Sequence, residues 1–95
     1  MRMLELADFS ECIDRQFTIV AGEERLKLVL AEAVEAKGGR PGNRAPFSLI
    51  FRGPAEPLLP QATYNIEHPR LGPLDIFIVP IGKDEHGVRY QAIFS

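Results

Sequence analysis

The chain has 95 residues, of which 45% are hydrophobic and 25% charged, and its formal net charge is −2. This length predicts one domain spanning residues 1–95, and this composition excludes a disordered tail. A slightly acidic chain also argues against a nucleic-acid-binding protein, because such proteins usually present a basic face that neutralises phosphates.

The first predicted element is a short helix over residues 6–13, with Asp8 as a candidate N-cap. Phe9 and Ile13 are spaced to pack on the same side of that helix. Cys12 lies beside Ile13, and acidic residues flank it. A reactive thiol needs an electropositive, exposed setting, so we expect Cys12 to be a small buried hydrophobic side chain.

Residues 25–37 follow a short predicted strand (16–20) and a turn (21–24), and they allow two interpretations. Strong helix formers dominate the segment, and a helical stripe would contain Leu26, Val29, Leu30, Ala33 and Val34. However, the leucines at 26, 28 and 30 also alternate with other side chains, as they would in a strand paired with 16–20. Propensity alone favours the helix.

The charged residues between positions 37 and 52 are all basic, namely Lys37, Arg40, Arg44 and Arg52. Glycines and prolines gather in 37–46, which predicts a flexible loop and the most mobile internal segment. The simplest interpretation of these charges is that they keep the loop solvated. Arg52, Arg40 and Arg44 are nevertheless the candidates for contact with an anion or a protein partner, because a guanidinium binds carboxylates and phosphates. For Arg52 we favour a bracing role, in which it donates hydrogen bonds to carbonyls of the following loop.

Short segments after residue 46 alternate apolar and polar side chains between glycine and proline borders, which predicts strands over 47–51, 63–68, 74–81 and 88–94. The links between the last three are too short for a parallel crossover, so these strands should form an antiparallel meander. Residues 74–79 are apolar on nearly both faces, which is typical of a doubly covered strand. We therefore expect Phe77 and Ile78 both to be buried.

Together these elements predict a mainly β fold of about six antiparallel strands, arranged as a small barrel or a strongly bent sheet. The short N-terminal helix would plug one end. A closed barrel removes exposed strand edges, whereas an open sheet would leave an edge strand through which two copies could form a homodimer.

Two histidines are candidates for catalysis or metal binding. His68 follows Glu67 at the end of a predicted strand, where adjacent side chains point to opposite faces, so we interpret it as a turn histidine rather than half of a general-base pair. His86 ends the run Asp84-Glu85-His86, which offers possible ligands but lacks the ligand number and spacing of a zinc site. Consecutive turns of a meander lie at opposite ends, so the two histidines should be far apart.

The sequence also predicts a cytoplasmic protein. Glu5 falls within the first residues and no apolar stretch follows it, unlike a secretory signal. No window approaches the about 18 continuous apolar residues that a membrane-spanning helix needs. Cys12 is the only cysteine, which excludes an internal disulfide and a multi-cysteine zinc site. We expect a reducing compartment, no membrane contact and no cofactor.

Three runs of residues carry a family pattern: F-S-L-I-F-R-G-P over 47–54, L-P-Q-A-T-Y-N-I-E-H-P over 59–69 and L-G-P-L-D-I-F-I-V-P-I-G over 71–82. With Asp8-Phe9-Ser10 and Phe17, they resemble a family of small bacterial domains of unknown function, and the resemblance covers nearly the whole chain. It implies a strand over 26–34, which favours the second interpretation of that segment. It also implies an association with phage-tail-like fibre and collar proteins.

From these features we predict a non-catalytic structural or protein-interaction module, which the resemblance makes an accessory to a phage-tail-like assembly. One alternative is a mini-barrel that binds a small ligand in its interior or mouth. Another is an enzyme that uses His68, His86 and Arg52. A packed interior would favour the module, an apolar cavity with polar groups the binder, and two adjoining histidines the enzyme.

Overall fold

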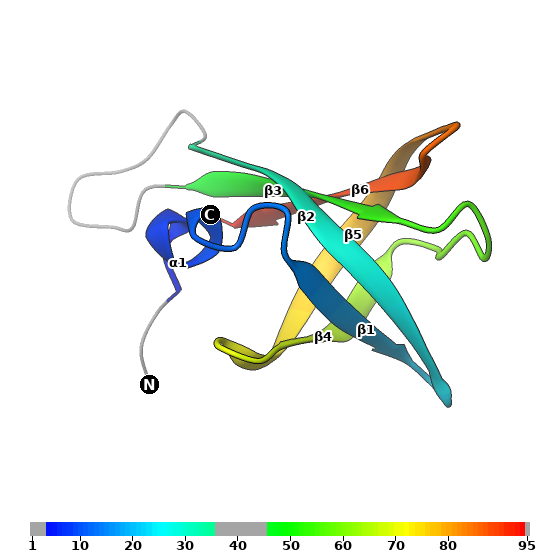
Figure 1. The fold of residues 1–95 in the computed structure, drawn as a ribbon, viewed down its shortest axis with the longest axis horizontal. Coiled ribbons are helices and arrows are strands. Elements are labelled where there is room, and N and C mark those ends of the chain that lie inside the picture. Colours follow the sequence, from blue (N-terminus) through cyan, green and yellow to red (C-terminus); the bar gives the residue numbers. More distant parts are fainter. Residues whose placement is uncertain (1–3, 36–45, 95) are drawn as a thin grey trace.

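The computed structural model describes residues 4–35 and 46–94. These residues form one short helix and six strands: α1 (Leu6–Ser10), β1 (Gln16–Ala21), β2 (Glu24–Glu35), β3 (Phe47–Gly53), β4 (Ala62–His68), β5 (Gly72–Asp84) and β6 (Gly87–Phe94). The strands pair antiparallel in the order β1–β2–β3–β6–β5–β4, and β1 pairs with β4 to close a barrel (Figure 1). The predicted mainly β fold with a short helix is confirmed.

Residues 24–35 form the long strand β2, so the helix that propensity favours is wrong and the strand implied by the family resemblance is correct. β2 pairs with β1 along one edge and with β3 along the other. Leu28 and Leu30 alternate with exposed residues and are fully buried. Hydrogen bonding on both edges and the burial of these leucines outweigh the weak helical preference of the same residues.

The last three strands form the predicted antiparallel meander, in which β5 pairs with β4 and with β6. The prediction that both Phe77 and Ile78 are buried is wrong for Phe77, which is 51% exposed, whereas Ile78 is fully buried. A barrel has one interior, and adjacent side chains on a strand point to opposite faces. The apolar residues on the other face of β5 therefore lie on the outer surface of the barrel.

Apolar side chains from all six strands fill the barrel interior. Two aromatic rings meet there, where Phe17 and Phe51 pack edge to face with their centroids 5.3 Å apart. The buried side chains of the strands are Phe17, Ile19, Leu28, Leu30, Phe47, Leu49, Phe51, Ile66, Ile76, Ile78, Val88, Tyr90 and Ala92. This set includes the alternating residues that predicted the strand over 47–51.

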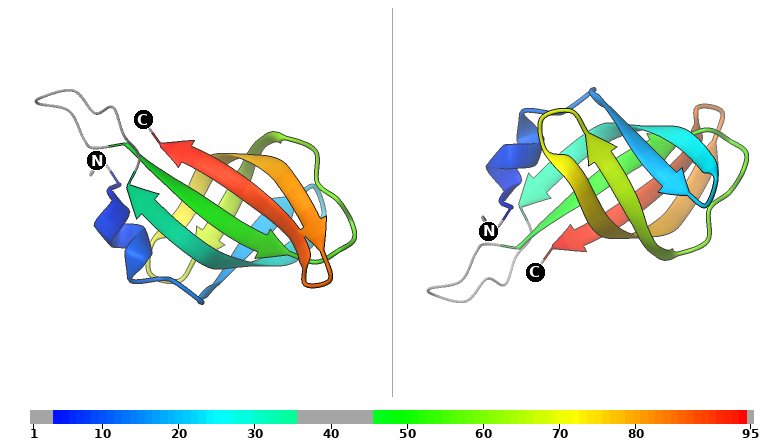
Figure 2. Two further views of the ribbon diagram at one scale, coloured as in Figure 1. Left: turned by 90° about the horizontal axis from the view of Figure 1, so that it is seen from above. Right: turned by 90° about the horizontal axis from the view of Figure 1, so that it is seen from below.

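Helix α1 covers one end of the barrel, as expected (Figure 2). The Phe9 ring lies 5.8 Å from Phe47 and 5.5 Å from Phe94, measured between centroids. The predicted N-cap is wrong, because Glu5 precedes the helix and the Asp8 carboxylate accepts the Glu5 N–H at 2.8 Å. The helix ends at Ser10 instead of residue 13, since the chain turns there and reaches a positive φ of 66° at Asp14.

The loop between β3 and β4 is fixed to the barrel by a buried hydrogen bond. The Leu59 N–H donates to the Tyr90 hydroxyl at 3.0 Å, and both side chains belong to the core. An unpaired buried N–H is costly, because it loses its water without gaining a partner. Tyr90 therefore holds the loop against β6.

We expect Tyr90→Phe to lower the free energy of unfolding by about 1–3 kcal/mol, because it leaves the Leu59 N–H buried without an acceptor. Chemical denaturation measures this difference. The matched control is Tyr64→Phe, which removes a hydroxyl that donates to the Pro60 carbonyl at an exposed position. That variant should change stability by about 0.5 kcal/mol or less. Equal losses in the two variants would contradict the bracing role of Tyr90.

Candidate functional site

The two candidate histidines lie at opposite ends of β5, as expected. His68 ends β4 at the turn into β5, and His86 lies in the turn between β5 and β6. β5 itself runs for 13 residues between these turns. The barrel therefore does not bring the two rings together, and neither ring can complete a site formed by the other.

The turn around His86 is a local hydrogen-bonded structure. The Asp84 carboxylate accepts the His86 N–H at 2.7 Å, and the His86 ring lies 3.5 Å from the Glu85 carboxylate. All three side chains are exposed. Within residues 4–35 and 46–94, no group of three His, Cys, Asp or Glu side chains is placed to hold a metal ion. The short-range bonds of an Asx-type turn explain this run of polar residues.

Arg52 does not brace the following loop as we expected. It lies on the outer surface of β3, directly opposite Arg89 of β6, and Tyr90 holds the loop instead. The Nε atoms of Arg52 and Arg89 are both buried without a hydrogen-bond partner in the described part of the chain. Arg89 also pairs with Glu32 of β2 at 3.3 Å. Of these two neighbouring cations, Arg89 has a carboxylate partner among the described residues and Arg52 has none, so the positive charge of Arg52 is the less compensated.

Arg40 and Arg44, the other candidate contact residues, lie outside the described residues. The predicted mobility of the loop over 37–46 lies outside them too, apart from Pro46. No helix among the residues that are described is long and apolar enough to cross a membrane.

Beside the two arginines, the outer surface of β2, β3 and β6 carries exposed apolar side chains among polar ones. Cross-strand pairing places Val34, Ser48 and Ile93 in one row, and Val34 and Ile93 are 51% and 68% exposed. The next row contains Glu32, Ile50 and Gln91, and the third contains Val29, Arg52 and Arg89. We call these three rows the outer apolar face. Phe77 and Ile81 add exposed apolar area on the neighbouring strand β5.

The opposite side of the barrel, formed by β1 and β4, presents polar side chains instead. Arg25 and Glu67 form an ion pair at 3.3 Å, and the Asn65 amide reaches the Asp75 carboxylate at 3.5 Å. Cross-strand pairing aligns Lys27, Thr18 and Glu67 on the same surface. The outer apolar face is therefore confined to one side of the barrel.

Sequence reasoning did not find the outer apolar face, although a signal was present. Val34 and Ile93 occupy positions that alternation assigns to the outside of their strands, and Phe77 stands between two buried isoleucines. A strand that is apolar on both faces predicts cover on both sides. Among the described elements, none packs on the outer side of β5. The fold itself therefore does not explain why the outer residues of this strand are apolar.

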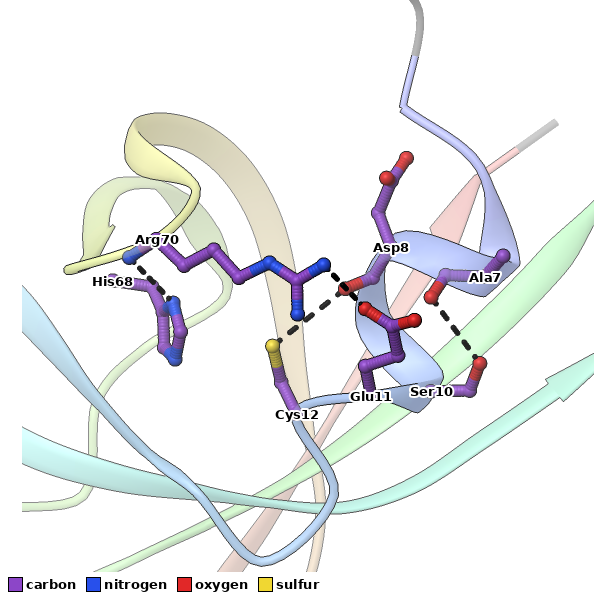
Figure 3. Close-up of polar contacts among 7 residues, drawn as sticks. All are labelled: Ala7, Asp8, Ser10, Glu11, Cys12, His68 and Arg70. Atoms are coloured by element: carbon purple, nitrogen blue, oxygen red, sulfur yellow. Dashed lines mark hydrogen bonds and ion pairs between the residues drawn. The ribbon is translucent and has the colours of Figure 1, made fainter.

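At the end of the barrel next to α1, an ion pair joins two segments that are distant in sequence. Figure 3 shows the Arg70 side chain extending from the turn between β4 and β5 to the Glu11 carboxylate. Cys12 lies below this pair, and its thiol donates to the Asp8 carbonyl at 3.6 Å. Burial raises the pKa of the Cys12 thiol, which agrees with the expected unreactive side chain.

His68 is fixed in this cluster by two contacts. Its Nδ1 accepts the backbone N–H of Arg70 at 3.1 Å (Figure 3). Its ring also packs on Phe17, with 4.7 Å between centroids. Burial lowers the pKa of His68 below its usual value, and the nearby charges of Arg70 and Arg15 lower it further. The ring is therefore neutral near pH 7, in agreement with its interpretation as a turn histidine.

Comparison with known proteins gives a family but no activity. Residues 4–94 match the model of a family described as Domain of unknown function (DUF6916). No curated protein and no solved structure matches the chain.

Proposed function

Because the chain belongs to the DUF6916 family of unknown function, we propose from the geometry of its barrel that it is a non-catalytic protein-interaction module. The observation that carries this proposal is the outer apolar face. Val34 on β2 and Ile93 on β6 are half or more exposed there, and β3 lies between these two strands, on one side of the barrel only. Contiguous apolar surface of this kind is typical of a protein–protein contact.

The charges on the outer apolar face support a protein partner that carries a carboxylate. Arg52 and Arg89 stand opposite each other, and among the residues that the structure describes Glu32 alone offsets their mutual repulsion. An acidic side chain of a partner would pair with Arg52 and supply a hydrogen-bond acceptor to this part of the surface. Arginine beside apolar residues is also a common composition for an interface core.

A homodimer through an edge strand is not the form of contact that we propose. The barrel is closed, so the strand order leaves no edge strand among the described residues. Two copies could still meet through their outer apolar faces. A contact with its two-fold axis near Arg52 and Arg89 would bring these arginines of both copies together, and like charges in an interface are costly. We therefore infer that the partner is a different protein.

The wider setting is proposed on the sequence resemblance alone. On that basis the partner would be a component of a bacterial phage-tail-like assembly, and this domain an accessory to it. The buried free thiol of Cys12 agrees with a reducing cytoplasm as the place where the domain folds.

The two alternative functions find less support in the geometry. A small-ligand binder that uses the barrel interior would need space there, but side chains from all six strands occupy it. An enzyme that uses His68, His86 and Arg52 would need these groups to converge. The two histidines lie at opposite ends of β5, and Arg52 lies on the outer surface of β3.

We expect Ile93→Glu to abolish partner capture without unfolding the barrel. Ile93 is exposed, so the change should cost about 1 kcal/mol or less in stability. An unpaired charge placed in an apolar contact should weaken binding about tenfold or more. Affinity capture of the tagged protein from its own host, followed by quantitative mass spectrometry, measures the loss.

The matched control is Leu58→Glu, which replaces another exposed aliphatic residue outside the outer apolar face. The proposal requires a protein that wild type and Leu58→Glu both retain and that Ile93→Glu loses. It is wrong if Ile93→Glu and wild type retain the same proteins in the same amounts, or if Leu58→Glu loses them equally.

A further inference from the structure

A cleft of about 460 Å³ lies beside the ion pair at the α1 end of the barrel. It opens between the segment that follows α1 and the turn that joins β4 to β5. Its lining residues are Glu11, Cys12, Arg15, Gln16, His68, Pro69 and Arg70. This size is within the range of small-molecule sites, and the cleft is separate from the outer apolar face.

Positive charge exceeds negative charge in this cleft. Arg70 is paired with Glu11, but Arg15 forms no ion pair or side-chain hydrogen bond within the described residues. Cys12 is buried and its thiol donates to a carbonyl, so it adds no charge. One guanidinium charge therefore remains uncompensated beside a second guanidinium.

The tautomer of His68 adds a hydrogen-bond donor to these cations. Its Nδ1 accepts the Arg70 backbone N–H, so the proton of the neutral ring must be on Nε2. Packing against the buried Phe17 ring holds the imidazole in place. A ligand at His68 Nε2 thus meets an N–H at neutral pH and a cationic ring at lower pH.

We propose that this cleft binds an oxyanion, either a carboxylate or a phosphate group, between Arg15, Arg70 and the Nε2–H of His68. A guanidinium donates paired hydrogen bonds to such groups, and an imidazole N–H donates a further hydrogen bond from another direction. Glu11, which also lines the cleft, holds Arg70 in place through their ion pair. The inference stands on the cleft and does not depend on the proposed protein contact.

The charges around His68 give this site a defined pH dependence. Burial, Arg70 and Arg15 all lower the pKa of the free ring, and a bound anion would raise it again. Binding should therefore tighten as the pH falls through the pKa of His68 in the complex, because the anion then meets a cationic ring. The other groups that face His68 from both sides of its turn are Glu11, Cys12 and Glu67.

NMR of the His68 imidazole in the intact chain tests the proposal, with inorganic phosphate and acetate as separate probes at constant ionic strength. We expect a saturable shift of the His68 signals and a raised pKa of the ring in the complex. Acetate, which is largely ionised at both pH values, should bind more tightly at pH 5.5 than at pH 7.5. Arg15→Gln and Arg70→Gln should each weaken binding about tenfold, the value of one charge-assisted hydrogen bond. The tighter of the two probes identifies the ligand as a phosphate or a carboxylate compound.

Lys83→Gln is the matched control, since it removes one exposed positive charge at the other end of β5. It should leave the affinity unchanged. The proposal is overturned if neither probe produces a saturable His68 shift in the wild-type protein. It is overturned equally if both arginine variants bind as wild type does, or if Lys83→Gln weakens binding as much as they do.

Discussion

Replacing Ile78 by alanine is expected to lower the free energy of unfolding by about 2–5 kcal/mol. Ile78 is fully buried on β5 and lies opposite Ala62 of β4. Alanine would remove apolar surface from the barrel interior and leave a cavity, because neighbouring strands joined by hydrogen bonds cannot collapse into the space. Urea denaturation followed by circular dichroism gives the difference in free energy directly.

The control for this variant is the adjacent residue. Phe77→Ala removes a larger side chain, yet Phe77 is half exposed on the outer surface of the same strand. Its loss should cost about 1 kcal/mol or less. If Phe77→Ala destabilised the protein as strongly as Ile78→Ala, the assignment of inner and outer faces on β5 would be wrong.

Gly87→Ala is expected to cost about 3 kcal/mol or more. Gly87 begins β6 with φ at +120°, a conformation that side chains rarely adopt. A Cβ atom at this position would lie 2.1 Å from the Gly53 carbonyl oxygen, which belongs to the paired backbone of β3. Either the β5–β6 turn or the β3–β6 pairing must then shift. Thermal or chemical unfolding of the purified variant measures the loss, and failure to fold agrees with it.

Gly82→Ala, on the other strand of the same hairpin, is the matched control. A Cβ atom there meets nothing within 4 Å. The substitution should change stability by about 1 kcal/mol or less. Similar effects of the two substitutions would show that the close approach of β6 to β3 at Gly53 is not present in solution.

Local sequence determined most of the strands and their connections. Alternating apolar residues such as Phe47, Leu49 and Phe51 bury one face of a strand, and this period of two does not depend on the rest of the chain. Short links bordered by glycine and proline permit only antiparallel neighbours. The strands after residue 46, with the meander of β4, β5 and β6, follow from these two constraints.

Local sequence did not determine the conformation of residues 24–35. Helical propensities differ by less than about 1 kcal/mol per residue, so they act only as a weak preference. In the folded chain β2 forms hydrogen bonds with β1 and β3 and buries Leu28 and Leu30. The pairing with β3 comes from residues that are farther along the chain, and together with the β1 pairing it is stronger than the local helical preference.

The surfaces that carry our proposals exist only in the tertiary structure. Closure of the barrel gives β5 one buried face, so Phe77 lies outside although its strand looks buried on both sides. Pairing of β3 with β6 places Arg52 beside Arg89, which are distant in sequence. The turn after β4 brings His68 and Arg70 against Arg15 in the same way. The sequence by itself determined which residues alternate along each strand. Barrel closure decided which residues of different strands lie side by side, because this depends on the pairing register of strands that are distant in sequence and not on the local period of two.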